Sequence, residues 1–308
     1  MLENTIEKPS IFCNAYSLKR RNKLFLLPIL TFIFIIFGQG LSIAPAIESQ
    51  LFTPEQVEVY PYILYFLLIT FPSILVLLIL WVKFYEGRNL ESLGLGLSRA
   101  STKHLINGAT CGLFMAMAIV ASILLLGGYK LGNNAPFTLS SIVPPLLLLA
   151  GFLVQSWSEE VLFRGWLLSR FFELKGQGFA ILASSLMFIL VHLLSFDFNE
   201  FSLSNFVIFF LMTLLFSSFL AMMTIHYQSI WFAAAWHGLW NWFFINGSGL
   251  PTTGISLDIR PLFLNLDSVV TAPIWLTGGI DGPENSVVTI LVLAVANLYS
   301  YKLISKTR

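Results

Sequence analysis

Long apolar segments alternate with short polar ones along this 308-residue chain. A helix that crosses a lipid bilayer needs about 20 consecutive, mostly apolar residues. Segments of about this length lie near residues 24–43, 61–82, 104–127, 144–172, 177–198, 204–226, 229–246 and 286–304. The pattern predicts an all-α polytopic transmembrane helical bundle of about eight spans. Because no polar stretch is long enough to fold alone, we expect residues 1–308 to form a single membrane domain.

The composition supports a membrane protein. Hydrophobic residues make up 56% of the chain and charged residues only 11%, whereas soluble domains contain about 25% charged residues. The formal net charge is +1, which argues against a nucleic acid partner. The lipid bilayer is therefore the first partner that the sequence predicts.

The distribution of charge predicts the orientation of the bundle, since lysine and arginine favour cytoplasmic connections. Basic residues lie in the N-terminal tail, after the second span, beside the turn near 173–176 and at the C-terminus: Lys8, Lys19, Arg20, Arg21, Lys23, Lys83, Arg88, Arg99, Lys103, Arg170, Lys175, Lys302, Lys306 and Arg308. The connection around 44–60 contains three glutamates and neither lysine nor arginine. We therefore expect both termini to be cytoplasmic, the long loop 247–285 to be extracytoplasmic, and the protein to lie in the plasma (inner) membrane.

The first apolar segment has a second interpretation. Basic residues precede it and Ala44-Pro45-Ala46 follows it, as in a signal peptide with a small-residue cleavage site. The polar stretch ahead of it is long for a signal peptide, and a proline between the alanines is a poor cleavage context. We therefore expect a retained membrane anchor.

Ionisable residues lie inside three of the predicted spans. The fourth span contains Glu159, Glu160 and Arg164, the fifth contains His192, and the seventh contains His237. A charged group at the centre of a bilayer costs about 2.5–3.5 kcal/mol on insertion scales, so such a residue is a candidate functional site.

Helical geometry separates the roles of the two glutamates. Residues four apart share a helix face, so Glu160 and Arg164 can neutralise each other, while Glu159 points about a quarter turn away. The same spacing pairs Phe188 with His192 and His237 with Asn241.

The predicted depths of these groups in the membrane are similar. At about 1.5 Å of rise per residue, Glu159 and His192 lie roughly 21 and 22 Å from the inner ends of their spans, and His237 and Asn241 roughly 12 and 18 Å. Three segments that are distant in sequence thus place their polar groups in one slab of the bilayer.

These residue types suit hydrolysis by an activated water. A carboxylate and an imidazole can hold and deprotonate a water molecule, and a second imidazole and an amide can donate hydrogen bonds to an oxyanion. The sequence contains no His-Glu-x-x-His motif, no pair of intramembrane aspartates and no Gly-x-Ser-x-Gly motif. We expect no cofactor, although Glu159, His192 and His237 could also form a zinc site.

The ordered motifs Glu159-Glu160-x-x-x-Arg164, Phe188-x-x-x-His192 and His237-x-x-x-Asn241 resemble those of the CPBP family. These are CAAX proteases and bacteriocin-processing proteins, typified by the Ras-converting CAAX endopeptidase. The resemblance covers about residues 144–246 and implies a glutamate-dependent intramembrane endopeptidase acting on a peptide or membrane-protein substrate. It implies that Glu159 and His192 activate water, that His237 and Asn241 form the oxyanion site, and that Glu160, Arg164 and Phe188 support them.

Other functions remain open at this stage. In a non-catalytic bacteriocin-immunity or scaffold membrane protein, the charged cluster would be an ion pair that holds helices together. A transporter is a weaker alternative, since repeated halves and broken helices are not evident in the sequence. The resemblance does not imply that the substrate is prenylated.

Overall fold

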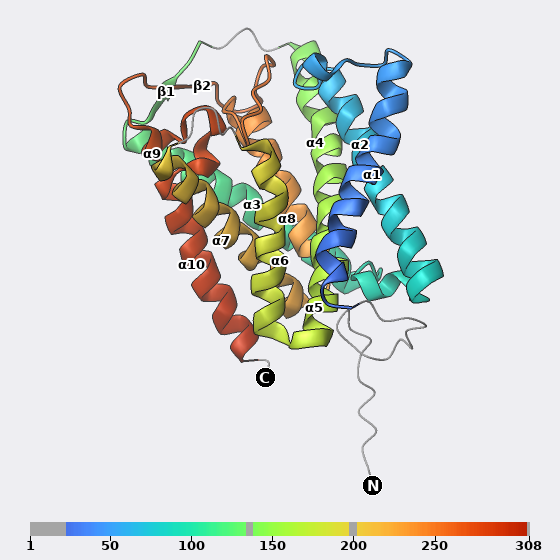
Figure 1. The fold of residues 1–308 in the computed structure, drawn as a ribbon. Coiled ribbons are helices and arrows are strands. Elements are labelled where there is room, and N and C mark those ends of the chain that lie inside the picture. Colours follow the sequence, from blue (N-terminus) through green and yellow to red (C-terminus); the bar gives the residue numbers. More distant parts are fainter. Residues whose placement is uncertain (1–22, 134–137, 197–201, 307–308) are drawn as a thin grey trace.

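The computed structural model describes residues 23–133, 138–196 and 202–306, and it is a bundle of helices with one small β-ribbon (Figure 1). The helices are α1 (Leu26–Glu48), α2 (Tyr62–Leu80), α3 (Arg99–Leu125), α4 (Leu139–Glu160), α5 (Leu168–Lys175), α6 (Gln177–His192), α7 (Leu203–Tyr227), α8 (Trp231–Trp242), α9 (Ile274–Thr277) and α10 (Val287–Ser305). The strands are β1 (Tyr129–Leu131) and β2 (Leu266–Ser268). The prediction of an all-α membrane bundle is confirmed.

Six helices within the described residues are long and apolar enough to cross a membrane: Leu26–Glu48, Tyr62–Glu86, Arg99–Leu125, Leu139–Lys175, Leu203–Tyr227 and Val287–Ser305. The fifth and seventh predicted spans are shorter helices. The fifth ends at His192 and not near 198, and the seventh is α8 followed by a π-helical turn over Phe243–Gly247. The number of spans and the cytoplasmic location of the termini stay predictions, and the basic residues up to Arg21 and Arg308 lie outside the described residues.

The N-terminal segment considered as a signal peptide is part of α1. This helix continues through Ala44-Pro45-Ala46 and ends at Glu48. Proline is tolerated inside membrane helices because neighbouring groups satisfy the freed backbone carbonyl. Whether the segment is retained as an anchor stays a prediction.

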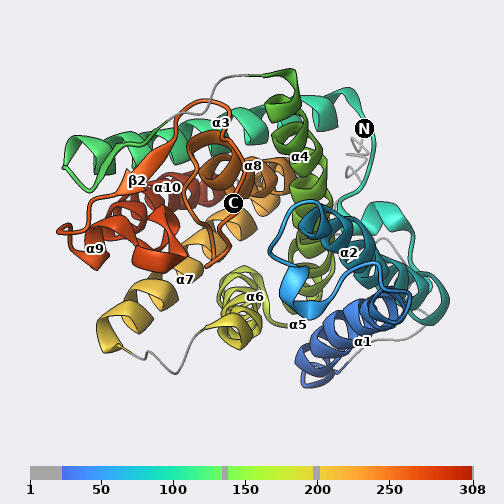
Figure 2. The ribbon, with the colours of Figure 1, turned by 90° about the horizontal axis from the view of Figure 1, so that it is seen from above.

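Helix α8 lies at the centre of the bundle and packs against α3, α4 and α7 (Figure 2). Its close approach to α3 depends on two glycines four residues apart, a spacing that lets helix backbones come close together. A Cβ atom at Gly108 would lie 2.2 Å from the carbonyl oxygen of Phe232, and one at Gly112 would lie 2.5 Å from that of Trp236. The α3 backbone therefore sets the position of the helix that contains His237.

The fourth span is one long helical segment in three parts. Helix α4 ends at Glu160, a π-helical turn covers Val161–Leu167, and α5 continues to Lys175. Gly176, with a φ of +82°, reverses the chain into α6. The α1/α2 pair packs on the α4 side of the bundle, apart from α7 and α10 (Figure 2).

The segment after α8 folds over one end of the bundle, opposite the end where α1 begins and α10 ends (Figure 1). Its strand β2 pairs with β1 in an antiparallel ribbon, with Tyr129 opposite Ser268. The Tyr129 hydroxyl donates to the Thr277 carbonyl oxygen at 2.6 Å, and burial raises the pKa of this tyrosine. The sequence pattern does not predict this ribbon, because its strands contain only three residues each.

Candidate active site

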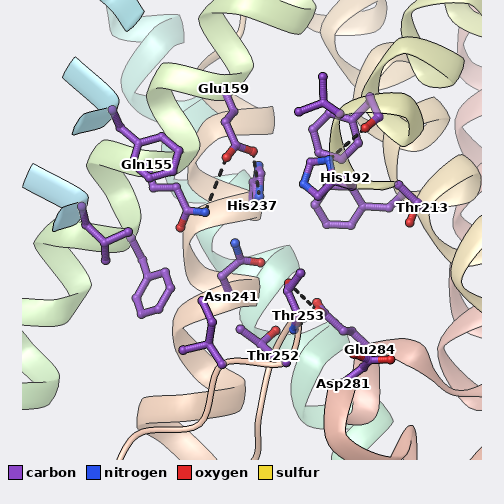
Figure 3. A pocket seen from close by; sticks show the side chains of 18 of the residues that line it. Gln155, Glu159, His192, Thr213, His237, Asn241, Thr252, Thr253, Asp281 and Glu284 are labelled. Carbon is purple, nitrogen blue, oxygen red and sulfur yellow. Dashed lines mark hydrogen bonds and ion pairs between the residues drawn. The ribbon is translucent and has the colours of Figure 1, made fainter. Parts of the chain in front are cut away.

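A cavity of about 710 Å³ lies inside the bundle (Figure 3). Helices α1, α2, α4, α6, α7 and α8 line it, together with the segment that follows α8. Of the predicted site residues, Glu159, Phe188, His192, His237 and Asn241 line the cavity. Three distant parts of the sequence thus meet in one space, as their predicted depths require.

Glu159 is the penultimate residue of α4, and its side chain is 13% exposed. Its Oε2 lies 3.9 Å from Nε2 of His237 and accepts no hydrogen bond from a described residue. Its Oε1 lies 3.5 Å from Nε2 of Gln155, one turn earlier on α4. The carboxylate therefore lies at the wall of the cavity, next to Gln155 and His237 (Figure 3).

Glu160 is fully buried beside the cavity and does not line it. Its Oε1 lies 2.9 Å from Nη1 of Arg164, which confirms the ion pair expected from their spacing, and 2.9 Å from Nδ1 of His237. Arg164 also donates from Nη2 to the Ser217 hydroxyl at 3.1 Å. The second glutamate and the arginine thus connect α4 and the π-helical turn with α7 and α8.

His192 is the last residue of α6 and is held by Phe188, one turn earlier. Its ring lies 4.1 Å from the Phe188 ring, centroid to centroid. Its Nδ1 lies 2.9 Å from the Phe188 carbonyl oxygen, so the ring donates this hydrogen bond. This contact fixes the orientation of the imidazole at the cavity wall.

His237 and Asn241 lie one turn apart on α8 and are 3% and 8% exposed. His237 lies between the two glutamates, since Nδ1 contacts Glu160 and Nε2 faces Glu159. Asn241 lies further along the cavity, toward the segment after α8 (Figure 3). The set combines a carboxylate, two imidazoles and an amide around one space, and it can bind a water molecule and a polarised carbonyl group.

Groups of three or more His, Cys, Asp or Glu arranged to hold a metal ion are not found among the described residues. His192 and His237 each have Nδ1 engaged, by a backbone carbonyl and by a carboxylate. Outer partners of this kind fix the orientation of an imidazole whether its other nitrogen contacts water or a metal.

Sequence reasoning missed three kinds of cavity residue. Gln155 could have been found, because it lies four residues before Glu159 on the same face. Thr213 of α7 lines the cavity near His192 and is 3% exposed, and its hydroxyl has no hydrogen-bond partner within the part of the chain that the structure describes. The end away from Glu159 is lined by Thr252–Ile255 and by Ile280, Asp281, Glu284 and Asn285. No periodic pattern marks these residues, because they belong to a loop.

Residues 141–243 match the family model Rce1-like, described as type II CAAX prenyl endopeptidase Rce1-like. This segment extends from the start of α4 to just after α8 and contains all the predicted site residues. The match confirms the resemblance to CAAX proteases that the three motifs indicate. A comparison with curated proteins gave no match.

Proposed function

We propose, from the premise that residues 141–243 form an Rce1-like CAAX-protease domain, that this protein is an intramembrane endopeptidase whose Glu159 activates the attacking water. The family match supports a protease that acts within a membrane, and the six long apolar helices among the described residues support multi-pass insertion. The catalytic roles given below to Glu159, His192, His237 and Asn241 are part of this proposal.

The observation that carries the proposal is the different environment of two adjacent glutamates. Glu160 is fully buried and shares one oxygen between Arg164 and His237. Glu159 lines the cavity, and its side chain is 13% exposed. A carboxylate in hydrogen-bond reach of a water molecule can act as its general base, and Glu159 is the glutamate of this pair that has access to one.

The chemistry follows from these positions. Glu159 takes a proton from a water molecule that His192 helps to orient, and the water oxygen attacks the carbonyl carbon of the peptide bond. Asn241 and His237 donate hydrogen bonds to the oxyanion that forms. The C–N bond then breaks as the proton held by Glu159 passes to the leaving nitrogen, which yields a carboxyl group and an amine.

Glu160 and Arg164 act on the site through His237 and do not line the cavity. Nδ1 of His237 lies 2.9 Å from Oε1 of Glu160, which orients the ring with its Nε2 on the side of Glu159. Arg164 in turn holds Glu160 in place. Glu160 and Arg164 are therefore positioning residues for His237.

The test uses the purified full-length protein in detergent with a library of quenched fluorescent apolar peptides. Glu159→Gln keeps the shape of the side chain and removes the base. We expect cleavage to fall at least about 100-fold, the lower end of what general-base catalysis contributes, with unchanged thermal stability. Glu91→Gln, at an exposed glutamate outside the cavity, is the matched control and should cleave like the wild type. Cleavage at the wild-type rate by Glu159→Gln would refute the proposal.

The proposed reaction uses no metal ion. We expect EDTA and 1,10-phenanthroline to leave cleavage unchanged under conditions in which they inactivate a zinc protease in the same assay. Loss of activity that added zinc restores would instead assign Glu159, His192 and His237 as metal ligands.

A non-catalytic scaffold or immunity protein makes the opposite prediction. Its biological effect in cells would survive Glu159→Gln, because the ion pair of Glu160 and Arg164 would be intact. The same variant therefore separates the two functions.

A further inference from the structure

Two cavity residues beside the proposed catalytic groups have buried polar atoms that lack a partner. Gln155 lines the cavity one turn before Glu159 on α4, and Thr213 lines it from α7 near His192 (Figure 3). Oε1 of Gln155 and the hydroxyl of Thr213 are buried and make no hydrogen bond with the described residues. Because an unsatisfied buried polar group is unfavourable, each atom gains a hydrogen bond from a complementary group that enters the cavity.

Glu159 determines which end of the Gln155 amide lacks a partner. The amide nitrogen of Gln155 lies 3.5 Å from Oε1 of Glu159. A carboxylate oxygen accepts hydrogen bonds, so the NH₂ end of the amide is the end that faces it. The carbonyl oxygen at the other end is the acceptor without a donor. One side chain can therefore contact Glu159 and accept from an incoming N–H group at the same time.

The walls that hold these two residues are otherwise apolar. The described residues of α2 and α4 that line the cavity are apolar apart from Gln155 and Glu159, and those of α7 are apolar apart from Thr213. Phe152 and Phe216 are examples of the apolar lining. A peptide main chain that enters such a space gives up its hydrogen bonds to water, which is costly unless they are replaced. Its N–H and C=O groups therefore need the few partners that these walls provide.

The positions of Gln155 and Thr213 suit a peptide that lies across the proposed catalytic groups. Figure 3 shows the two residues on either side of the pair formed by Glu159 and His237. The Gln155 oxygen can accept from an N–H group, and the Thr213 hydroxyl can donate to a carbonyl oxygen. A peptide main chain carries both kinds of group on each side of any peptide bond.

We propose that Gln155 and Thr213 bind the main chain of the substrate. Oε1 of Gln155 accepts from a peptide N–H on one side of the scissile bond, and the Thr213 hydroxyl donates to a peptide C=O on the other side. The inference rests on the proposed function. It requires the bound segment to be extended, because the main-chain groups within an α-helix are already paired with each other.

Binding tests the Gln155 contact without turnover. Glu159→Gln, purified full-length in detergent, is titrated with a fluorescent apolar peptide and with a series in which each amide is replaced in turn by an ester. An ester keeps the shape of the main chain but has no N–H group. We expect one ester position to weaken binding about tenfold, since loss of a buried hydrogen bond has roughly this effect. Gln155→Met in the same background should bind that ester and the parent peptide equally.

Gln39→Met is the matched control, because Gln39 of α1 also lines the cavity. This variant should keep the tenfold loss at the same ester position. A purely structural role of Gln155 would weaken the binding of all peptides together and would not single out one amide. A series without a sensitive position, a sensitivity that persists in Gln155→Met, or an equal effect of Gln39→Met would overturn the Gln155 contact.

Thioamide peptides test the Thr213 contact, because sulfur accepts a hydrogen bond more weakly than oxygen. We expect one thioamide position to weaken binding to Glu159→Gln. Thr213→Val should abolish this difference, and Thr213→Ser, which keeps a hydroxyl, should retain it. Thr70→Val is the control, since the Thr70 hydroxyl donates to the Phe66 carbonyl oxygen at 2.8 Å and the residue does not line the cavity. A difference that survives in Thr213→Val would contradict the contact.

Cleavage by the wild type separates this inference from the proposed function. If the parent peptide is cleaved but no position-specific loss depends on Gln155 or Thr213, the endopeptidase stands and the main-chain contacts fail. If the ester and thioamide series report both contacts but no peptide is cleaved, the contacts stand and the endopeptidase fails.

Discussion

The guanidinium carbon of Arg164 lies 4.6 Å from the centre of the Phe188 ring, while Nη1 of the same group pairs with Glu160. A cation above an aromatic face is attracted to it. The arginine thus contacts one residue that holds His237 and another that holds His192. Arg164 fixes the relative positions of the two imidazoles from behind the cavity.

Removing Arg164 should therefore be costly. Arg164→Gln leaves Glu160 buried with one charged partner fewer, and breaking a buried ion pair in this way costs about 3–5 kcal/mol. We expect a lower unfolding temperature in detergent and a loss of peptide cleavage. The double variant Glu160→Gln/Arg164→Gln removes both charges and should be more stable than Arg164→Gln alone. A double variant that is less stable by the sum of the two single effects would contradict this coupling.

The glycines of α3 should be intolerant of even one methyl group. Gly108→Ala and Gly112→Ala place a Cβ against the α8 backbone, and overpacking of this kind costs about 1–3 kcal/mol. Because α8 contains His237, we expect a fall in cleavage as well as in thermal stability. Gly40→Ala in α1 is the control, since a Cβ there meets no atom within 4 Å. A destabilisation of Gly40→Ala as large as that of Gly108→Ala would contradict the packing argument.

Glu284 should make stability depend on pH. Burial raises the pKa of this carboxyl above its ordinary value of 4.5, although donors such as Thr253 oppose the shift. The folded protein therefore holds the proton more tightly than the unfolded chain. Its contribution to stability is complete below about pH 4.5 and is lost as the pH rises through the higher pKa of the folded state.

The measurement is the unfolding temperature across this pH range. Glu284→Gln cannot titrate, so its unfolding temperature should fall less steeply from acid to neutral pH than that of the wild type. Glu91→Gln should retain the wild-type slope, because Glu91 is exposed. Equal slopes for Glu284→Gln and the wild type would exclude Glu284 as the source.

Sidedness can be measured at two exposed positions. Val270, in the loop after α8, is 95% exposed, and Leu97, between the second and third spans, is 84% exposed. In a background without Cys13 and Cys111, we expect a membrane-impermeant maleimide to label Val270→Cys in intact cells, and Leu97→Cys only after the cells are opened. The reverse labelling pattern would invert the predicted topology and place the loop after α8 on the cytoplasmic side.

Much of the bundle follows from local properties of the chain. Apolar segment length alone locates α1, α2, α3, α7 and α10, because a bilayer requires long apolar helices. Four-residue spacing is enough to pair Glu160 with Arg164 and Phe188 with His192. These relationships lie within a single helix, so no tertiary information is needed to derive them.

The remaining features depend on contacts between distant segments. Nothing near His237 in the sequence shows that its Nδ1 contacts Glu160, since this pairing requires the packing of α8 on α4. The early end of α6 at His192 is equally hidden, because the residues after it are still apolar. The loop after α8 lacks any periodicity, and its place in the cavity lining follows from hydrogen bonds such as those between Glu284 and Thr253.

The π-helical turn over Val161–Leu167 has a consequence for how the fourth span is oriented. A turn with one additional residue rotates all later side chains by about 100° relative to a regular α-helix. A single helical wheel drawn from Leu139 to Lys175 therefore assigns wrong directions to the side chains that follow the turn, from Leu168 onward. One continuous helical segment can in this way direct Glu159 into the cavity. Ser169 and Phe171, near its other end, are nevertheless buried in the bundle.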